Sequence, residues 1–512
     1  LLPDRCQAVV VVPDLGRLGE HLAVLPKLKL ATLLSSMAGY PDAEGFFADL
    51  ARQAGYDPRS RASMAAVGLD PSRPLIGYIS EEGVALLAIP ESDSTKIDAL
   101  LENNAVRRLG AKKRTEERAG SQSLTLFSTE GTAAAPAIAW SHGGGYVFLT
   151  QGAPGVQLLK AVLERKTEGS LSKDTRFAAA RQRLGGQDLY AFSCVDALPL
   201  KKRIFIPYGT IVAASLSANG AKLSLELPLD DAWAGKLQSL ATPAGTDLLG
   251  RVDPNAFLIG RLGGDPRLLE PLLDKLLPSA FKRAFHEGGI DPKAELLQNL
   301  QPGVALSLSL APSARLSGVP ELDVRRTNPF EFVTLSLVGR PLDPSKASQT
   351  LKKVAEIAPR FGARMEQSEI SGTPVFTTRY HLGEGASLAL KDDFAVVTGG
   401  VGQMQAQLER LSQPAVSSIA DPEARRSLQE DAFALYLDAT RLIGGVRQLP
   451  DSAYGIGGFA IRAAVSRWLD AVEEITALRA SARLGADKTD HAELALTLTL
   501  APPMAQKDAR AP

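Results

Sequence analysis

The sequence predicts an α+β protein of two tandem modules, each a largely antiparallel sheet with helices packed on it. Three observations support this fold class. Apolar runs come in hairpin pairs, Leu- and Ala-rich helical patterns lie between them, and both recur in the same order in each half. Because regular strand–helix alternation is missing, a doubly wound parallel α/β fold is the second choice.

Both halves begin with an apolar entry strand, at residues 7–12 and 255–260, and continue into a Leu-rich helical pattern. A Gly-x-Asp-Pro phrase follows in each half, starting at Gly55 and Gly289. Glycine suits the left-handed end of a helix, aspartate caps the next helix, and proline fits its first turn. We therefore expect one helix to end and another to begin at each phrase. The first half alone has an extra helical stretch before its phrase, at residues 33–53.

The matching order continues to the end of each half. Strands are expected at 84–89 and 333–338, helices at 95–109 and 345–361, strands at 123–127 and 373–377, and hairpins that end at 146–150 and 394–398. A Gly-containing turn then precedes helices at 156–165 and 404–411, and Asp174 and Asp421 introduce a second helix. Apolar strands ending on Asp196 and Asp438 come next, before alternating strands at 211–229 and 475–500.

So many matches in one order predict an internal repeat. The expected modules span residues 1–245 and 250–502, joined by a turn-rich linker at 241–246. The Pro-, Ala- and charge-rich residues 503–512 are expected to be a disordered tail.

The connections after Asp196 and Asp438 are unusually apolar and differ in length, and the longer one includes a helical pattern at 463–475. One interpretation is that both fold back over the core as lids. The alternative is an apolar ligand mouth or a partner surface. The candidate surface residues are Ile204, Phe205, Ile206, Tyr208, Tyr454, Ile456, Phe459 and Trp468.

Catalytic motifs are incomplete throughout the sequence. His142 begins a His-Gly-Gly-Gly phrase like the oxyanion loop of lipases, but no G-x-S-x-G nucleophile elbow is present, so we interpret it as a hairpin turn. The glycines at 399–402 lack the spacing of a phosphate-binding loop. The five histidines are far apart in sequence. We predict no catalytic, metal-binding or cofactor-binding residues and no cofactor.

The two cysteines, Cys6 and Cys194, lie near the first strand and near the strand that ends on Asp196. If these strands are neighbours, a disulfide is sterically reasonable. Two buried free thiols are the other main possibility, and a lipid-modified Cys6 is a third. No CxxC phrase is present.

Composition excludes several classes of partner. Lys plus Arg and Asp plus Glu are both 57, so the chain has no net positive charge to attract nucleic acid. Aromatic residues make up only 6%, which disfavours base-stacking surfaces. No uninterrupted apolar window reaches the length of about 18 residues that a transmembrane helix needs.

The Leu2-Pro-Asp phrase, the Gly-x-Asp-Pro turns and the repeated α+β module resemble bacterial secreted proteins catalogued as domains of unknown function. The resemblance covers most of the chain and implies an extracytoplasmic location, in the periplasm or at the cell surface. We expect a non-enzymatic binding or scaffold protein of the envelope, with a protein partner or an apolar ligand. The alternative is a carrier of a lipid or other apolar ligand, and the second alternative is a hydrolase with an unrecognised site.

Overall fold

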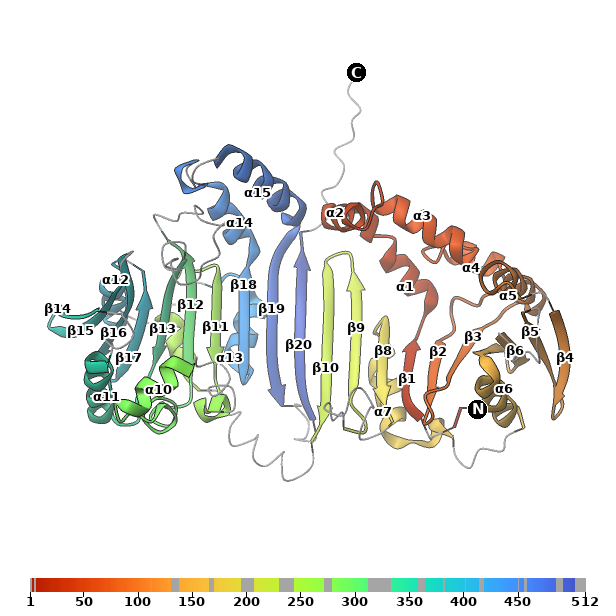
Figure 1. Ribbon diagram of the computed structural model, residues 1–512, viewed down its shortest axis with the longest axis horizontal. Helices are drawn as coiled ribbons and strands as arrows, with labels where there is room; N and C mark the ends of the chain where they lie inside the picture. The colour runs from red at the N-terminus through yellow and green to blue at the C-terminus, as the bar shows by residue number, and fades with distance from the viewer. Residues whose placement is uncertain are drawn as a thin grey trace, which may run out of the picture. The chain divides into compact units, whose positions relative to one another are not determined.

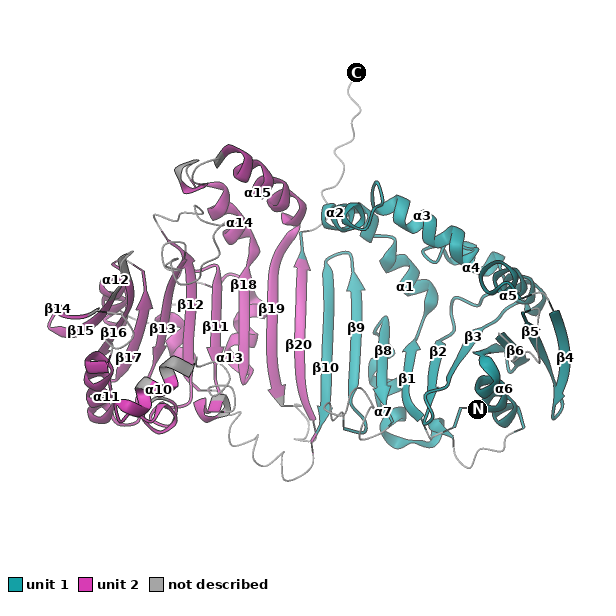
Figure 2. Cartoon of the chain, viewed as in Figure 1, with its two compact units in different colours: residues 1–228, 500–512 teal, residues 229–499 magenta. Residues whose placement is uncertain are grey.

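The computed structural model describes residues 2–3, 6–111, 113–129, 138–164, 170–194, 207–229, 244–270, 279–311, 333–357, 364–380, 383–400, 402–413, 419–449, 451–454, 458–484 and 491–501. The chain divides into two compact units, unit 1 (residues 1–228 and 500–512) and unit 2 (residues 229–499) (Figure 2). The division falls earlier than the boundary expected near residue 245. The expected tail at 503–512 lies outside the described residues.

Unit 1 contains an antiparallel sheet with strand order β10-β9-β8-β1-β2-β3-β7-β6-β5-β4 (Figure 1). At one end of this order, β4 presents mostly charged, exposed side chains, which disfavour edge-to-edge pairing. The strands are β1 (Cys6–Val12), β2 (Leu75–Ser80), β3 (Ala85–Pro90), β4 (Lys113–Ala119), β5 (Gln122–Ser128), β6 (Ile138–Gly143), β7 (Tyr146–Gln151), β8 (Leu189–Ser193), β9 (Ile211–Ser217) and β10 (Gly220–Pro228).

Helices pack on both faces of this sheet. Phe148 of β7 belongs to a buried cluster with residues of α6 and α7, whereas its neighbour Val147 packs with residues of α4 and α5. Successive side chains of a strand point to opposite faces, so these clusters are two separate layers. The helices are α1 (Leu15–Leu22), η1 (Leu25–Lys27), α2 (Lys29–Met37), α3 (Ala43–Ala54), α4 (Arg61–Ala66), α5 (Ser94–Leu109), α6 (Gly152–Leu163), η2 (Leu171–Lys173) and α7 (Thr175–Leu184).

Unit 2 has the strand order β20-β19-β18-β11-β12-β13-β17-β16-β15-β14, and the ladders from β19 to β14 are antiparallel. The fold is therefore α+β, as predicted, and the second choice of a doubly wound parallel α/β fold is wrong. The strands are β11 (Leu258–Leu262), β12 (Val304–Leu310), β13 (Val333–Gly339), β14 (Arg364–Ile370), β15 (Thr373–Tyr380), β16 (Gly383–Lys391), β17 (Phe394–Gly399), β18 (Phe433–Asp438), β19 (Ile475–Leu484) and β20 (His491–Leu500).

Some helices of unit 2 contribute to two buried clusters, one that joins α12 and α13 to the sheet and one around α14 and α15. The bounds of the described helices of this unit are as follows. They are η3 (Thr246–Gly250), η4 (Pro266–Leu269), α10 (Ser279–Glu287), η5 (Pro292–Leu297), α11 (Pro344–Ile357), α12 (Gln403–Leu411), α13 (Pro422–Glu430), α14 (Ala439–Arg447), η8 (Asp451–Tyr454) and α15 (Gly458–Val472).

The two units follow the same strand order, with β1 to β10 in the places that β11 to β20 take. Helices also match, because Asp174 caps α7 and Asp421 caps α13, and both helices precede the strand next to the entry strand. Common descent of the two units remains a prediction, since equal topology can arise without it.

Some helix boundaries differ from those predicted. Asp57 does not cap a helix, because α4 begins at Arg61 and Ser60 accepts the Ser63 amide at 3.2 Å. Gly152 to Gly155, expected as a turn, form the first turn of α6, where Pro154 loses no helical hydrogen bond. The helix expected at 463–475 is α15, which begins at Gly458 and ends at Val472, before β19.

A helix that the sequence reading missed, α14, directly follows Asp438. Gly444 and Gly445 lie within it, and glycine is a poor helix former. A Cβ atom at Gly445 would lie 2.3 Å from Cδ1 of Leu310 on β12, so a larger residue there would displace the Leu310 side chain. Tertiary packing therefore outweighs the local propensity in this helix.

Candidate functional site

One cross-strand row in unit 1 carries five apolar or aromatic side chains on the same face of the sheet. The row runs from Tyr190 on β8 through Val11 on β1, Ile76 on β2 and Ala88 on β3 to Phe148 on β7. Residues directly opposite in neighbouring antiparallel strands point to the same face. The register of four ladders therefore assembles this surface from segments distant in sequence.

A cavity of about 230 Å³ lies over this row. All five residues of the row line the cavity, and η2 and α7 contribute to its walls through Leu171 and Phe177. Leu2, Pro74, Tyr146, Ser172 and Arg181 complete the lining. The cavity is apolar because α7 presents its buried stripe of Phe177, Ala180 and Leu184 on this side of the sheet.

Tyr190 is the polar residue buried deepest in this lining, with only 1% of its surface exposed. Burial raises the pKa of its phenol, because the charged phenolate is poorly solvated there. The hydroxyl makes no hydrogen bond to any described residue. Since a buried tyrosine hydroxyl usually has a partner, this group is available to a guest in the cavity.

Arg181 supplies positive charge where the cavity meets solvent. It follows the buried Ala180 on α7, and its own side chain is exposed while it lines the cavity. Its charge partly offsets the effect of burial by lowering the pKa of Tyr190. No carboxylate of the described residues forms an ion pair with this guanidinium.

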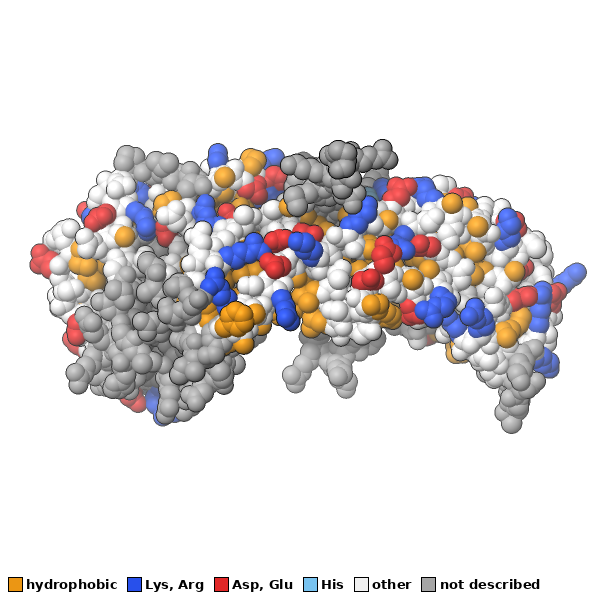
Figure 3. Space-filling view, turned by 90° about the horizontal axis from the view of Figure 1, so that it is seen from above, with side chains coloured by type: hydrophobic (Ala, Val, Ile, Leu, Met, Phe, Trp, Pro, Cys, Tyr) orange, Lys and Arg blue, Asp and Glu red, His pale blue; other side chains and the backbone are white. Residues whose placement is uncertain are grey.

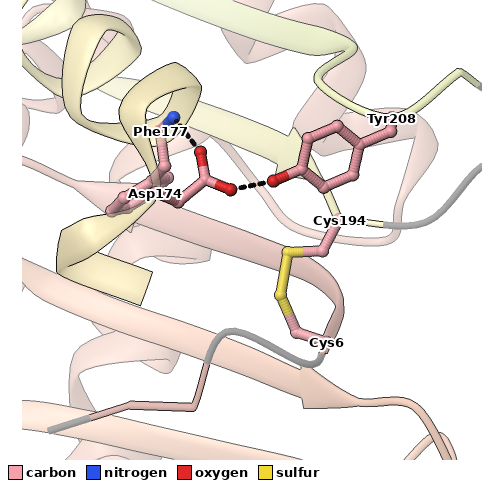
Figure 4. Close-up of a disulfide and its surroundings, with 5 residues drawn as sticks. All are labelled: Cys6, Asp174, Phe177, Cys194 and Tyr208. Atoms are coloured by element: carbon pink, nitrogen blue, oxygen red, sulfur yellow. Dashed lines mark hydrogen bonds between the residues drawn. A yellow bond between two sulfur atoms is a disulfide. The ribbon is translucent and has the colours of Figure 1, made fainter. Parts of the chain in front are cut away.

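A disulfide joins Cys6, at the start of β1, to Cys194, just after β8, with 5.4 Å between the Cα atoms (Figure 4). This separation is typical of disulfides. Of the alternatives that the sequence left open, the structure contains the bonded pair. The bond links the strands that carry Val11 and Tyr190, so it ties together two strands of the cavity floor.

Beside the disulfide, the Asp174 carboxylate lies between the Phe177 amide and the Tyr208 hydroxyl, and both donate to it (Figure 4). The Tyr208 ring meets Phe192 edge-on, with centroids 5.9 Å apart. The Asp174 contacts therefore hold the start of α7 and residue 208 together beside the cavity.

The corresponding row in unit 2 is filled rather than hollow. It runs through Ala434, Arg261, Ala305, Val338 and Val396 on β18, β11, β12, β13 and β17. Arg261, in the place of Val11, is fully buried. Its side chain therefore occupies space above the sheet that the smaller Val11 leaves empty in unit 1.

The Arg261 guanidinium is satisfied by backbone oxygens. It donates to the Ala244 carbonyl at 2.6 Å, to the Asp431 carbonyl at 2.7 Å and to the Leu428 carbonyl near the end of α13. Burial lowers the pKa of Arg261, and the nearby Asp431 carboxylate opposes this effect. Arginine remains charged in proteins, so these carbonyls compensate a buried cation.

Unit 2 has an open hollow of about 550 Å³ that is lined in part by Asp438. Asp438 closes β18, as predicted, and caps α14 by accepting the Arg441 amide at 2.8 Å. Its counterpart Asp196 lies outside the described residues. Tyr436 also lines the hollow, and burial, with the charges of Asp438 and Asp421, raises its pKa to about 12.

His142 is held between two carboxylates, with Nδ1 2.6 Å from Glu91 and Nε2 2.9 Å from Asp98. The Trp140 indole also donates to Asp98, at 2.6 Å. Burial lowers the pKa of His142, but the hydrogen bonds and charges of Asp98 and Glu91 outweigh it, and the net shift is upward. The turn that follows contains Gly144 and Gly145, both with positive φ, which confirms the predicted hairpin.

Among the described residues, no group of three or more His, Cys, Asp or Glu side chains could hold a metal ion. Within the same part of the chain, no helix is long and apolar enough to cross a membrane. Figure 3 shows Lys and Arg side chains mixed with Asp and Glu over the face seen from above. On that face the charges of the two signs are interspersed.

No protein-family model matches the chain, and no curated protein matches it. One solved structure that is similar over part of the chain is crystal form III of TP0453. The match has a TM-score of 0.26 and 8% identity, and it covers 47% of this chain and 87% of that chain. A likeness at this level carries no argument about function.

Of the candidate residues predicted after Asp196, Tyr208 is described, and it does not line the cavity. Ile204, Phe205 and Ile206 lie outside the described residues. Tyr208 is half-buried, packs against the core of unit 1 and bonds Asp174. At Tyr208 the structure therefore favours the interpretation in which this connection folds onto the core.

Of the candidate residues predicted after Asp438, Tyr454, Phe459 and Trp468 are described, and these three do not share one surface. Tyr454 is buried and donates its hydroxyl to the Val446 carbonyl at 3.2 Å, so it belongs to the core. Ile456 lies outside the described residues. Phe459 and Trp468 of α15 are 90% and 50% exposed, but nine residues along a helix place them on opposite sides.

The sequence reading missed the cavity residues for an identifiable reason. Tyr190 lies inside the apolar strand predicted to end on Asp196, whereas the predicted surface residues lie in the connections beyond Asp196 and Asp438. The heptad-like spacing of Phe177, Ala180 and Leu184 could have indicated a buried face of α7. The row itself depends on strand register, which the pattern of a single strand does not specify.

Proposed function

We propose that this chain is a non-enzymatic binding protein that holds a small apolar ligand in the cavity of unit 1. The observation that carries the proposal is the cavity of about 230 Å³ over the row from Tyr190 to Phe148. Apolar cavities exclude water and favour apolar guests. The corresponding row of unit 2 supports the proposal, because the buried Arg261 fills it. The strand order that both units share therefore does not by itself produce the cavity of unit 1.

Native mass spectrometry of protein purified from its own source tests this proposal. We expect an additional non-covalent mass that is extracted by organic solvent. The protein stripped of that mass should then bind an apolar fluorescent probe such as 1-anilinonaphthalene, which is uncharged. A bare protein mass together with no probe binding by the folded chain would contradict the proposal.

An extracytoplasmic location is the second part of the proposal. Disulfides persist in oxidising compartments, and Cys6 is bonded to Cys194 in the structure. Alkylation of unreduced, denatured protein from its source, followed by mass spectrometry, should find neither cysteine modified. Quantitative alkylation of both thiols would place the protein in a reducing compartment.

A scaffold role is the second candidate function, and the exposure of Phe459 favours it. The Phe459 side chain is 90% exposed, which is unusual because a side chain with so large an apolar surface is normally buried. If it contacts a protein partner, the native spectrum should contain a defined assembly that Phe459→Ser removes while the bound small molecule remains. Retention of the assembly in that variant would exclude Phe459 as its contact.

A further inference from the structure

We propose that the ligand is a single-chain carboxylate, whose apolar chain fills the cavity and whose carboxylate meets Arg181 and the Tyr190 hydroxyl. This inference rests on the proposed function and names its ligand class. The chemistry of two polar groups that line the cavity and the size of the cavity support it.

The polar groups of the lining are not equally available. The Ser172 hydroxyl lies 2.9 Å from the Ser170 hydroxyl and is engaged with it. Tyr146 lies under the Arg73 guanidinium, whose Cζ is 4.3 Å from the ring centroid. Arg73 in turn donates to the Gly145 carbonyl at 2.9 Å, so its charge is held at the β6–β7 turn.

The Tyr146 hydroxyl also makes no hydrogen bond to the described residues, but its ring is only partly buried. Two further polar groups are available to a ligand, and they differ in kind. Tyr190 is 1% exposed and offers a neutral hydroxyl that makes no hydrogen bond to the described residues. Arg181 offers a planar guanidinium at the solvent side of the same cavity. A carboxylate fits both, because it can accept two parallel N–H donors from arginine and a further O–H from tyrosine.

Cavity size restricts the apolar part to one chain. Sites for drug-sized ligands occupy roughly 300–1,000 Å³, whereas this cavity has about 230 Å³. A phospholipid with two acyl chains is therefore too large, and a free carboxylate of medium chain length is suitable. The rings of Phe148 and Phe177 line the cavity, so the apolar chain of the ligand packs between aromatic side chains rather than against water.

Titration calorimetry of the full, ligand-stripped chain with decanoate, decan-1-ol and acetate tests the inference. Decanoate is expected to bind about tenfold more tightly than decan-1-ol, because the neutral alcohol forms no charge-assisted hydrogen bond. Acetate, which has almost no apolar chain, should not bind measurably. Vesicles of dioleoylphosphatidylglycerol should not donate lipid to the protein in a flotation assay.

Variants separate the head group from the chain. Arg181→Gln should weaken decanoate binding about fivefold to tenfold and leave decan-1-ol unchanged, while Tyr190→Phe should weaken both ligands. Arg108→Gln removes the same charge from the exposed end of α5, outside the cavity lining, and should bind like the unmodified protein. Heat unfolding of each variant without ligand checks that the fold is retained.

The two proposals fail in different ways. If decan-1-ol and decanoate bind equally and Arg181→Gln changes neither, the carboxylate assignment is overturned while the apolar carrier stands. If the vesicle lipid transfers and decanoate does not compete with it, the ligand is a two-chain lipid and the size argument is overturned. If no ligand binds and the apolar probe also fails, both proposals are overturned.

Discussion

Val11 and Arg261 hold the same place in the two units, one in the hollow row of unit 1 and one in the filled row of unit 2. Val11 pairs with Tyr190 and Ile76, and Arg261 pairs with Ala434 and Ala305. The small side chain leaves space above the sheet, whereas the long one reaches backbone carbonyls near the end of α13. The same strand order is thus compatible with a solid core and with a cavity.

Filling the cavity should stabilise the empty protein and block its ligand. Ala88 lines the cavity and is buried, so Ala88→Leu adds apolar volume where space exists. We expect the free energy of unfolding to rise by about 1 kcal/mol, since each added buried methylene contributes roughly 0.8 kcal/mol before packing costs. Urea unfolding and binding of the apolar probe measure the two effects. A variant that still binds the probe with unchanged affinity would place the ligand elsewhere.

Ala305→Leu is the matched control in the filled row of unit 2. Ala305 is fully buried beside Arg261, so the larger side chain has no space to enter. Overpacking of this kind costs about 1–3 kcal/mol. The same change should therefore lower stability in unit 2 and leave ligand binding in unit 1 intact.

The parts of the fold that the sequence predicted depend on local patterns. The alternating strands at β9 and β10 and the aspartate caps of α7 and α13 involve neighbours within a few residues. Other features depend on contacts between distant segments. Gly445 packs against Leu310, which is distant in sequence, and Tyr190 lies opposite Val11 only through the register of β8 with β1.

The candidate site was harder to predict than the fold for the same physical reason. The Cys6–Cys194 pair was foreseen as one of several possibilities because it needs only two neighbouring strands. The cavity needs four registers, the buried face of α7 and the small side chain of Ala88 together. Composition and motif spacing contain no information about empty volume.

Removing the disulfide should destabilise unit 1 through its unfolded state. The bond spans a sequence separation of 188 residues. A cross-link over so long a segment restricts the unfolded chain, and native disulfides typically contribute 2–4 kcal/mol. We expect the double variant Cys6→Ser, Cys194→Ser to lose about that much free energy of unfolding in urea. Dithiothreitol should lower the stability of the unmodified protein to the same extent and leave the variant unaffected; an effect on the variant would contradict this origin.

Stability should depend on the ionisation of His142. Its pKa is raised in the folded protein because Asp98 and Glu91 outweigh the effect of burial. A raised pKa gives stabilisation that is fully present below the ordinary histidine pKa of about 6.5 and is lost as pH rises through the folded value. The midpoint of unfolding should therefore be lower at pH 8.5 than at pH 6. His142→Gln should remove most of this dependence of stability on pH. His286→Gln, at an exposed position of α10, serves as the control and should retain it.

Arg261→Met tests whether the buried guanidinium supports unit 2 as a structural element. Methionine preserves much of the apolar volume but leaves the carbonyls of Ala244, Leu428 and Asp431 without these donors. Each buried acceptor left unpaired costs about 1–3 kcal/mol, and this cost is smaller where water reaches the carbonyl. We expect the free energy of unfolding to fall by about 3 kcal/mol in urea.

The control for this change is Arg426→Met on α13, where the arginine is exposed and pairs with Glu430 at 2.9 Å. Exposed ion pairs contribute about 0–1 kcal/mol, so this variant should be nearly neutral. Equal effects of the two substitutions would mean that the loss of an arginine, and not of its buried hydrogen bonds, determines the result. A neutral Arg261→Met would instead mean that methionine packing replaces the three hydrogen bonds, and that the filled row needs volume rather than charge.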